Sequence, residues 1–123
     1  MKRDISTLND VQFLVDRFYD TVRKDPFIGT IFNEHLEGRW EAHLRKLYGF
    51  WHTILLRQPD YSGDPVSVHY NMNLNEDHFK QWLSLWDRTI DKYFEGKIAE
   101  RAKLRGGTMA KAFLSKIKKM KTD

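Results

Sequence analysis

The sequence contains no cysteine. This absence excludes disulfide bonds, iron–sulfur clusters, thiolate zinc sites and catalytic thiols. The chain also lacks an apolar run of about 18 residues, and its polar start, Met-Lys-Arg-Asp, does not lead into the apolar core of a signal peptide. We therefore expect a cytoplasmic protein that has no contact with a membrane.

Motifs for hydrolysis, nucleotide binding and carboxylate-based metal sites are missing as well. The chain has no glycine-rich phosphate loop and no Gly-x-Ser-x-Gly sequence around a nucleophilic serine. It has neither His-Glu-x-x-His nor Glu-x-x-His, the spacings that place zinc or di-iron ligands on one helix face. The sequence therefore argues against hydrolases, nucleotide-binding proteins, zinc peptidases and di-iron bundles.

The charge balance is only mildly basic. The chain has 21 Lys and Arg residues against 17 Asp and Glu, which gives a formal net charge of +4. Much of the excess lies between residues 101 and 121, where basic residues alternate with Phe113, Leu114 and Ile117 as on an amphipathic helix. We expect no nucleic-acid partner, and a basic helical protein that binds nucleic acid is kept as a minor alternative.

The spacing of apolar residues predicts one all-α domain over residues 1–123. Apolar positions recur about every 100° of helical rotation in four long segments. The expected helices cover about residues 9–24, 39–57, 76–94 and 97–119. No segment shows the alternation of a strand, and the length suits a single domain with its own core.

The ends of the long helices are predicted from capping residues and glycines. Asn9 is a plausible N-cap of the first helix, and Asn75 opens the third. Gly106 and Gly107 should weaken the middle of the last helix, because glycine is a poor helix former.

Prolines separate the long helices and mark the loops between them. The segment 26–38 is apolar but interrupted by Gly29, so we expect short turns there that carry Phe27 and its apolar neighbours into the core. Residues 66–73 are long enough only for a short helix.

Four chemically distinctive side chains are directed at one apolar interior: Tyr19, His43, His69 and Trp82. Taken singly, each is more typical of ordinary core packing, and one histidine does not make a metal site. Haem is the cofactor that needs a single protein ligand, since the porphyrin supplies four nitrogens and leaves an axial position for histidine in an apolar, aromatic slot.

Five motifs occur in an order that makes the chain similar to a known family. They are Phe18-Tyr19, the corner from Asp25-Pro26 to Phe32, the segment from His43 to Phe50-Trp51, the segment from Tyr61 through Gly63 and Pro65 to His69, and His78-Phe79-x-x-Trp82-Leu83. With these motifs the chain, over about residues 11–117, resembles the group III truncated haemoglobins. This resemblance implies a two-over-two helical sandwich around a haem.

The resemblance also implies roles for single residues. His69 would be the proximal iron ligand, and Tyr19, His43 and Trp82 would line the distal side. His78 competes with His69 for the proximal role. We favour His69 because its sequence neighbours Val66, Val68, Met72 and Leu74 are apolar, whereas His78 lies in the first turn of a helix, off the apolar face.

The remaining cofactor contacts follow from the same resemblance. Phe32 would pack on the porphyrin face, and Lys46 would pair with a haem propionate, with Tyr61 as a weaker candidate for that pairing. The hydrophobic cage would include Leu47, Phe50, Ile54, Met72, Phe79 and Trp86. Because there is no cysteine, the expected cofactor is haem b held without a covalent bond.

Two functions are compatible with such a pocket. The first is reversible binding of dioxygen, nitric oxide, carbon monoxide or similar small ligands, with the distal donors slowing their release. The second is an enzyme that acts on nitric oxide or peroxide, of the dioxygenase or peroxidase type, which would need an external reductase. A domain of this size can bury its own aromatic residues, so we expect a monomer.

Overall fold

The computed structural model describes residues 2–57 and 74–122, and the regular structure in these ranges is helical. Five helices follow one another there: α1 (Leu8–Lys24), α2 (Gly29–Leu36), α3 (Trp40–Leu56), α5 (Glu76–Tyr93) and α6 (Lys97–Thr122). No strand occurs within these ranges, where the β contact is an isolated bridge between Arg3 and Phe94. The expectation of an all-α fold is confirmed.

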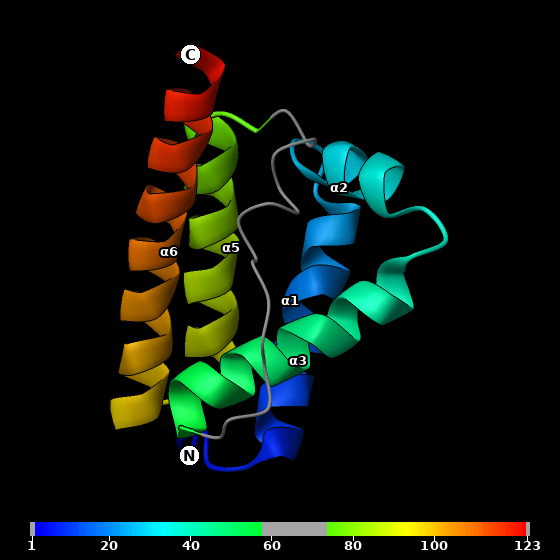
Figure 1. The fold of residues 1–123 in the computed structure, drawn as a ribbon. Coiled ribbons are helices and arrows are strands. Elements are labelled where there is room, and N and C mark those ends of the chain that lie inside the picture. Colours follow the sequence, from blue (N-terminus) through cyan, green and yellow to red (C-terminus); the bar gives the residue numbers. More distant parts are fainter. Residues whose placement is uncertain (1, 58–73, 123) are drawn as a thin grey trace.

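The helices form two pairs that pack on each other (Figure 1). α5 and α6 run antiparallel side by side, and α1 lies along the other side of α5. α3 crosses α1, and the carboxyl end of α3 reaches α6. α2 packs on α1. The pair α1–α3 over the pair α5–α6 is the expected two-over-two arrangement. Within the described ranges, no helix is long and apolar enough to cross a membrane.

α1 begins one residue earlier than predicted, and its N-cap is Thr7 instead of Asn9. The Thr7 hydroxyl accepts a hydrogen bond from the Asp10 backbone N–H at 3.1 Å, and the Asp10 carboxylate accepts one from the Thr7 backbone N–H, also at 3.1 Å. This reciprocal capping box satisfies two of the backbone donors that a helix start leaves free. Asn9 offers no such pairing, which explains the correction.

The segment after α1 is a helix, α2, and not the series of short turns that we expected. The Asp25 carboxylate accepts hydrogen bonds from the backbone N–H groups of Phe27 and Ile28, at 2.9 and 2.8 Å, and so turns the chain into the helix. Gly29 does not interrupt it. A Cβ at Gly29 would lie 2.7 Å from the Val22 carbonyl oxygen, so glycine lets α2 start directly against α1.

Phe27 does not enter the core as predicted. Its side chain is 48% exposed, and its ring packs on the His78 imidazole with 4.9 Å between ring centroids. The apolar character of this segment was therefore a poor guide to burial at its first position, because the turn made by Asp25 points Phe27 outward. The short helix expected over residues 66–73 lies outside the described residues.

α6 runs without interruption through Gly106 and Gly107, although we expected these glycines to weaken it. A Cβ at Gly106 would lie 2.6 Å from Cδ1 of Trp86, so the glycine gives the indole ring the space it needs. The Trp86 indole N–H donates a hydrogen bond to the Ala102 carbonyl oxygen at 3.0 Å. This packing and hydrogen bond offset the low helix propensity of glycine.

The centre of the core is a stack of three tryptophans from α3 and α5. The rings of Trp51 and Trp86 are 4.5 Å apart at 26°, and those of Trp82 and Trp86 are 5.8 Å apart at 16°. Phe18 of α1 meets Trp82 and Trp86 edge-on, with centroid distances of 5.2 and 4.9 Å. Because Trp82 and Trp51 also face the cavity described next, this stack fixes one side of the candidate site.

Candidate functional site

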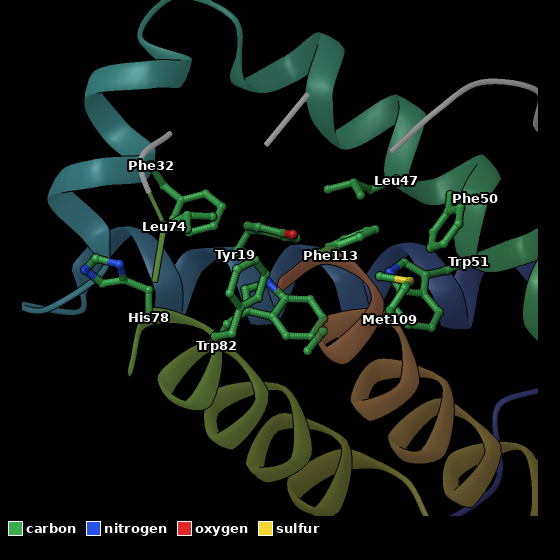
Figure 2. Close-up of a pocket in the computed structure, with 12 residues that line it drawn as sticks. Tyr19, Phe32, Leu47, Phe50, Trp51, Leu74, His78, Trp82, Met109 and Phe113 are labelled. Atoms are coloured by element: carbon green, nitrogen blue, oxygen red, sulfur yellow. The ribbon is translucent and has the colours of Figure 1, made fainter. Parts of the chain in front are cut away.

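An apolar pocket lies between the two helix pairs (Figure 2). It encloses about 520 Å³ of space free of protein atoms, part of which is open to solvent. Most lining side chains are aromatic or aliphatic, and Tyr19, Trp82 and His78 also bring polar atoms to the lining. The lining residues come from all five described helices and include Leu74. A largely apolar hollow with a few convergent polar groups is typical of a site for an organic cofactor or ligand.

Tyr19 and Trp82 form the polar centre of the pocket and lie close together there in Figure 2. Tyr19 comes from the buried face of α1 and Trp82 from that of α5, and both side chains are less than 9% exposed. Burial raises the pKa of Tyr19 to about 12, and a hydrogen bond with the Trp82 side chain acts in the opposite direction. The Tyr19 hydroxyl therefore keeps its proton at neutral pH and remains a hydrogen-bond donor.

The donor roles of the two side chains follow from the groups themselves. An indole N–H only donates, whereas the Tyr19 hydroxyl can donate and accept. Trp82, as a donor toward the Tyr19 oxygen, lowers the pKa of Tyr19 against the larger effect of burial. The two residues therefore offer buried hydrogen-bond donors to whatever binds in the pocket.

His43 lies in the layer behind Tyr19. It is 8% exposed on α3, and its ring meets the Tyr19 ring edge-on, with 5.9 Å between centroids. It is not among the residues that line the pocket in the described part of the chain. Of the three predicted distal residues, the structure thus brings Tyr19 and Trp82 to the pocket and places His43 one side chain away.

His78, the competing histidine, lies at the edge of the pocket. Its imidazole takes part in the capping box at the start of α5. Its Nδ1 accepts a hydrogen bond from the Asn75 backbone N–H at 3.0 Å, while the Asn75 side chain accepts one from the His78 backbone N–H at 3.1 Å. In a neutral imidazole with Nδ1 as acceptor, Nε2 carries the proton. Neither nitrogen then has a lone pair free for a metal.

The other predicted contacts divide into three groups. Phe32, Leu47, Phe50 and Phe79 line the pocket as expected. Three do not line it: Lys46 is exposed next to Leu47, Ile54 is half-buried one turn after Phe50, and Trp86 is fully buried behind Trp51 and Trp82. His69, Tyr61 and Met72 lie outside the described residues.

Sequence reasoning did not assign five residues that line the pocket: Trp51, Leu74, Met109, Ala110 and Phe113. Each was visible as part of an apolar stripe or next to a motif. Helical periodicity identifies the buried face of a helix. It does not show whether that face packs against another helix or borders a cavity. α6 contributes three of the five, and its stripe was read only as core.

Comparisons with known proteins agree with this geometry. Residues 4–113 match the family model described as bacterial-like globin. The chain is 30% identical over 95 residues to a group 3 truncated haemoglobin of Campylobacter jejuni subsp. jejuni, covering 74% of this chain and 75% of that protein. The crystal structure of a group III truncated haemoglobin from Campylobacter jejuni superposes with a TM-score of 0.84 at 26% identity, covering 95% of each chain.

Proposed function

Since the chain belongs to the bacterial-like globin family as a group III truncated haemoglobin, we propose that it reversibly binds dioxygen and other diatomic ligands at a haem b whose iron is ligated by His69. Globins bind such ligands through haem, and the pocket is the place in this chain that suits that group. The observation that carries the proposal is that the buried donors Tyr19 and Trp82 line one largely apolar pocket.

The residues present fit a haem. A porphyrin is a flat, largely apolar ring, and Phe32, Phe50, Phe79 and Phe113 give the pocket aromatic walls against which such a ring can pack. Burying the ring in this cavity would supply most of its binding free energy. Lys46, exposed at the margin beside Leu47, is free to extend toward a carboxylate of the cofactor.

Two observations support His69 as the axial ligand over His78. The Nδ1 lone pair of His78 already accepts the Asn75 backbone N–H, which leaves that ring tied to the start of α5. Leu74, five positions after His69 in the sequence, is part of the pocket lining. Met72 and Tyr61, from the same part of the sequence as His69, would complete the cofactor contacts, while Trp86 and Ile54 would support the lining residues without lining the pocket themselves.

When bound, the haem supplies an iron that binds a diatomic ligand and gives it partial negative charge. The protein supplies the donors, since the Tyr19 hydroxyl and the Trp82 indole both belong to residues that line the pocket. His43, packed edge-on against the Tyr19 ring, restricts that ring and can add a further donor if it turns inward. Such donors slow ligand release.

The first test is the absorption spectrum of the purified protein, reduced with and without carbon monoxide, for wild type, His69→Ala and His78→Ala. We expect a Soret band that shifts with carbon monoxide in wild type and in His78→Ala, and that is lost or weakened in His69→Ala. A band that survives His69→Ala but not His78→Ala would reverse the assignment. Absence of any band after hemin is added to wild type would refute the proposed function.

The second test addresses the donors. Tyr19→Phe removes one hydroxyl without changing the ring, and we expect dioxygen to dissociate about tenfold faster, the effect of losing one good hydrogen bond. Trp82→Phe should have a smaller effect, because the Tyr19 donor remains. The measurement is stopped-flow displacement of dioxygen by carbon monoxide, and equal rates in wild type and Tyr19→Phe would contradict the role of Tyr19.

A further inference from the structure

A second hollow lies on the outside of the helices that carry Tyr19 and Phe32. It is a groove with about 1160 Å³ of space that includes open solvent, between the carboxyl end of α1, α2 and the start of α3. Its walls are polar and charged, except for the indole of Trp40. Tyr19 and Phe32 face the pocket from the same helices, so the groove and the pocket lie on opposite sides of one thin wall.

Trp40 is the side chain that connects the two hollows. On the pocket side its ring packs against Tyr19 at 5.9 Å and against His43 at 6.1 Å between centroids. On the groove side the Arg23 guanidinium lies over the same ring, 4.7 Å from its centroid. A small molecule that passes from the groove toward the Tyr19 hydroxyl therefore meets the Trp40 ring first.

The start of α3, which carries Trp40, lies at the surface beside an open turn. The N-cap Arg39 forms no side-chain capping hydrogen bond, although its guanidinium donates to the His35 carbonyl and its backbone N–H to the Leu36 carbonyl at 2.8 Å. Gly38, two positions before Trp40, has φ +75° and no heavy atom within 4 Å of where its Cβ would be. Local opening is easiest at exposed helix ends of this kind.

We propose that Trp40, held closed by Arg23, controls the access of diatomic ligands to the pocket from this groove. The inference rests on the proposed function, because it assumes that the ligand binds beside Tyr19. Trp40 acts on the route and not on the bound ligand, since it does not line the pocket and packs behind Tyr19 and His43. A barrier on the route changes association and dissociation by the same factor and leaves the affinity unchanged.

The experiment compares four variants with wild type: Trp40→Ala, Trp40→Phe, Arg23→Gln and Lys24→Gln. Carbon monoxide association is measured after flash photolysis, and dissociation by replacement with nitric oxide. Arg23→Gln should speed both about two- to fivefold, the range that one exposed cation–π contact is worth, and Trp40→Ala should speed both by more than that. Trp40→Phe should fall close to wild type because it keeps a ring.

Lys24→Gln is the matched control, because Lys24 lines the same groove without contacting Trp40. It should leave both rates unchanged, which separates the Trp40 barrier from a general effect of charge in the groove. Faster dissociation with unchanged association in Trp40→Ala would overturn the proposal, since it would mean that Trp40 only positions Tyr19 or His43. Unchanged rates in both Trp40→Ala and Arg23→Gln would overturn it as well.

A measurement that does not need bound haem distinguishes a failure of the Trp40 barrier from a failure of the proposed function. Exchange of the Trp82 indole proton with solvent, followed by NMR on the full chain, reports how easily water reaches the pocket wall. Trp40→Ala and Arg23→Gln should accelerate this exchange, and Lys24→Gln should not. If wild type binds no hemin, the proposed function fails while this exchange still tests the barrier. Equal exchange in all variants would refute the barrier, whatever the haem content.

Discussion

The two sides of the pocket are built in different ways. α1 and α5, which carry Tyr19 and Trp82, each begin with a reciprocal capping box, made by Thr7 and Asp10 in α1 and by Asn75 and His78 in α5. The start of α2, which carries Phe32, is held by the Asp25 carboxylate, whereas α3, which carries Leu47, begins without a side-chain capping hydrogen bond. Tyr19 and Trp82 therefore lie on helices with capped starts, and the uncapped start of α3 borders the solvent groove.

Core packing follows the same division. On the α1–α5 side, Phe18 and Trp86 are completely buried, and the tryptophan stack fixes the Trp82 ring. α3 joins this stack only through Trp51, three turns after its start. Its first residue, Trp40, is half-buried and packs between Tyr19, His43 and the Arg23 guanidinium. The proposed donors thus lie on well-packed helices, and the proposed route passes the less buried start of α3.

The largest expected effect comes from removing the centre of the rigid side. Trp86→Ala should lower the free energy of unfolding by about 3–5 kcal/mol, because it leaves a cavity and removes the indole hydrogen bond to the Ala102 carbonyl. Trp40→Ala is the matched change on the other side and should cost about 1 kcal/mol, since the ring is half-buried. Urea unfolding followed by circular dichroism measures both, and equal losses would abolish the proposed difference between the sides.

Substitutions at the two glycines of α6 test how tightly the rigid side is packed around Trp86. Gly106→Ala should destabilise the protein by about 3 kcal/mol, because the added methyl group meets the Trp86 ring at 2.6 Å. Gly107→Ala should be neutral or stabilising by up to about 1 kcal/mol, since its nearest neighbour is 3.9 Å away and alanine favours the helix. Thermal unfolding of the two variants distinguishes them; a destabilising Gly107→Ala would show that packing there is tighter than described.

The α1 cap makes stability depend on pH. Burial alone would raise the pKa of Asp10, but hydrogen bonds from Arg3, Ser6 and Thr7 outweigh it and hold the pKa at about 2, below the usual 3.8. The folded state therefore favours the carboxylate, and this contribution is present above pH 4 and lost as pH falls through 2. Asp10→Asn should cost about 2 kcal/mol at pH 7.

The Asp10→Asn difference should shrink toward zero at pH 2, where wild type has lost the same charge. Urea unfolding at several pH values checks this dependence. A difference between wild type and Asp10→Asn that stays constant from pH 7 to pH 2 would mean that the carboxylate charge contributes nothing to the cap.

The smallest expected effect compares the caps directly. Asn75→Ala should cost about 1 kcal/mol because it opens the capping box of α5. Arg39→Ala should cost less than about 0.5 kcal/mol, because this N-cap makes no capping hydrogen bond with its side chain. Hydrogen exchange of the first-turn amides of α3 and α5 provides the local measurement. Faster exchange at the start of α5 than of α3 in wild type would contradict the order of stability.

Most of the helices were predictable because each carries its apolar stripe at helical spacing. The capping box at Asn75 and the ends of α3 and α5 fell within about one residue of their predicted places. α2 was missed because its start depends on a carboxylate turn at Asp25 and on the contact of Gly29 with α1, and neither shows in periodicity. The last helix was predicted, but its regularity at Gly106 was underestimated for the same kind of reason, since the contact with Trp86 does not show in the sequence pattern.

The candidate site was partly predictable. Tyr19 and Trp82 were identified from motifs, and the structure brings them to one pocket. Trp86 and Ile54 share apolar stripes with true lining residues, yet they lie behind or beside the wall. The stripe on α6 turned out to supply Met109 and Phe113 to the pocket. Which member of a buried stripe faces a cavity depends on how the helices cross, and the sequence of one helix does not contain that information.

The sequence by itself determined the helical class, the globin resemblance and the identity of the two buried donors, because periodicity, motif order and residue chemistry are local properties. The tertiary structure decided how these groups are used. It brought Tyr19 and Trp82 to one pocket and placed Trp40 between that pocket and the outer groove. These relations join residues from different helices, so they exist only after the chain has packed.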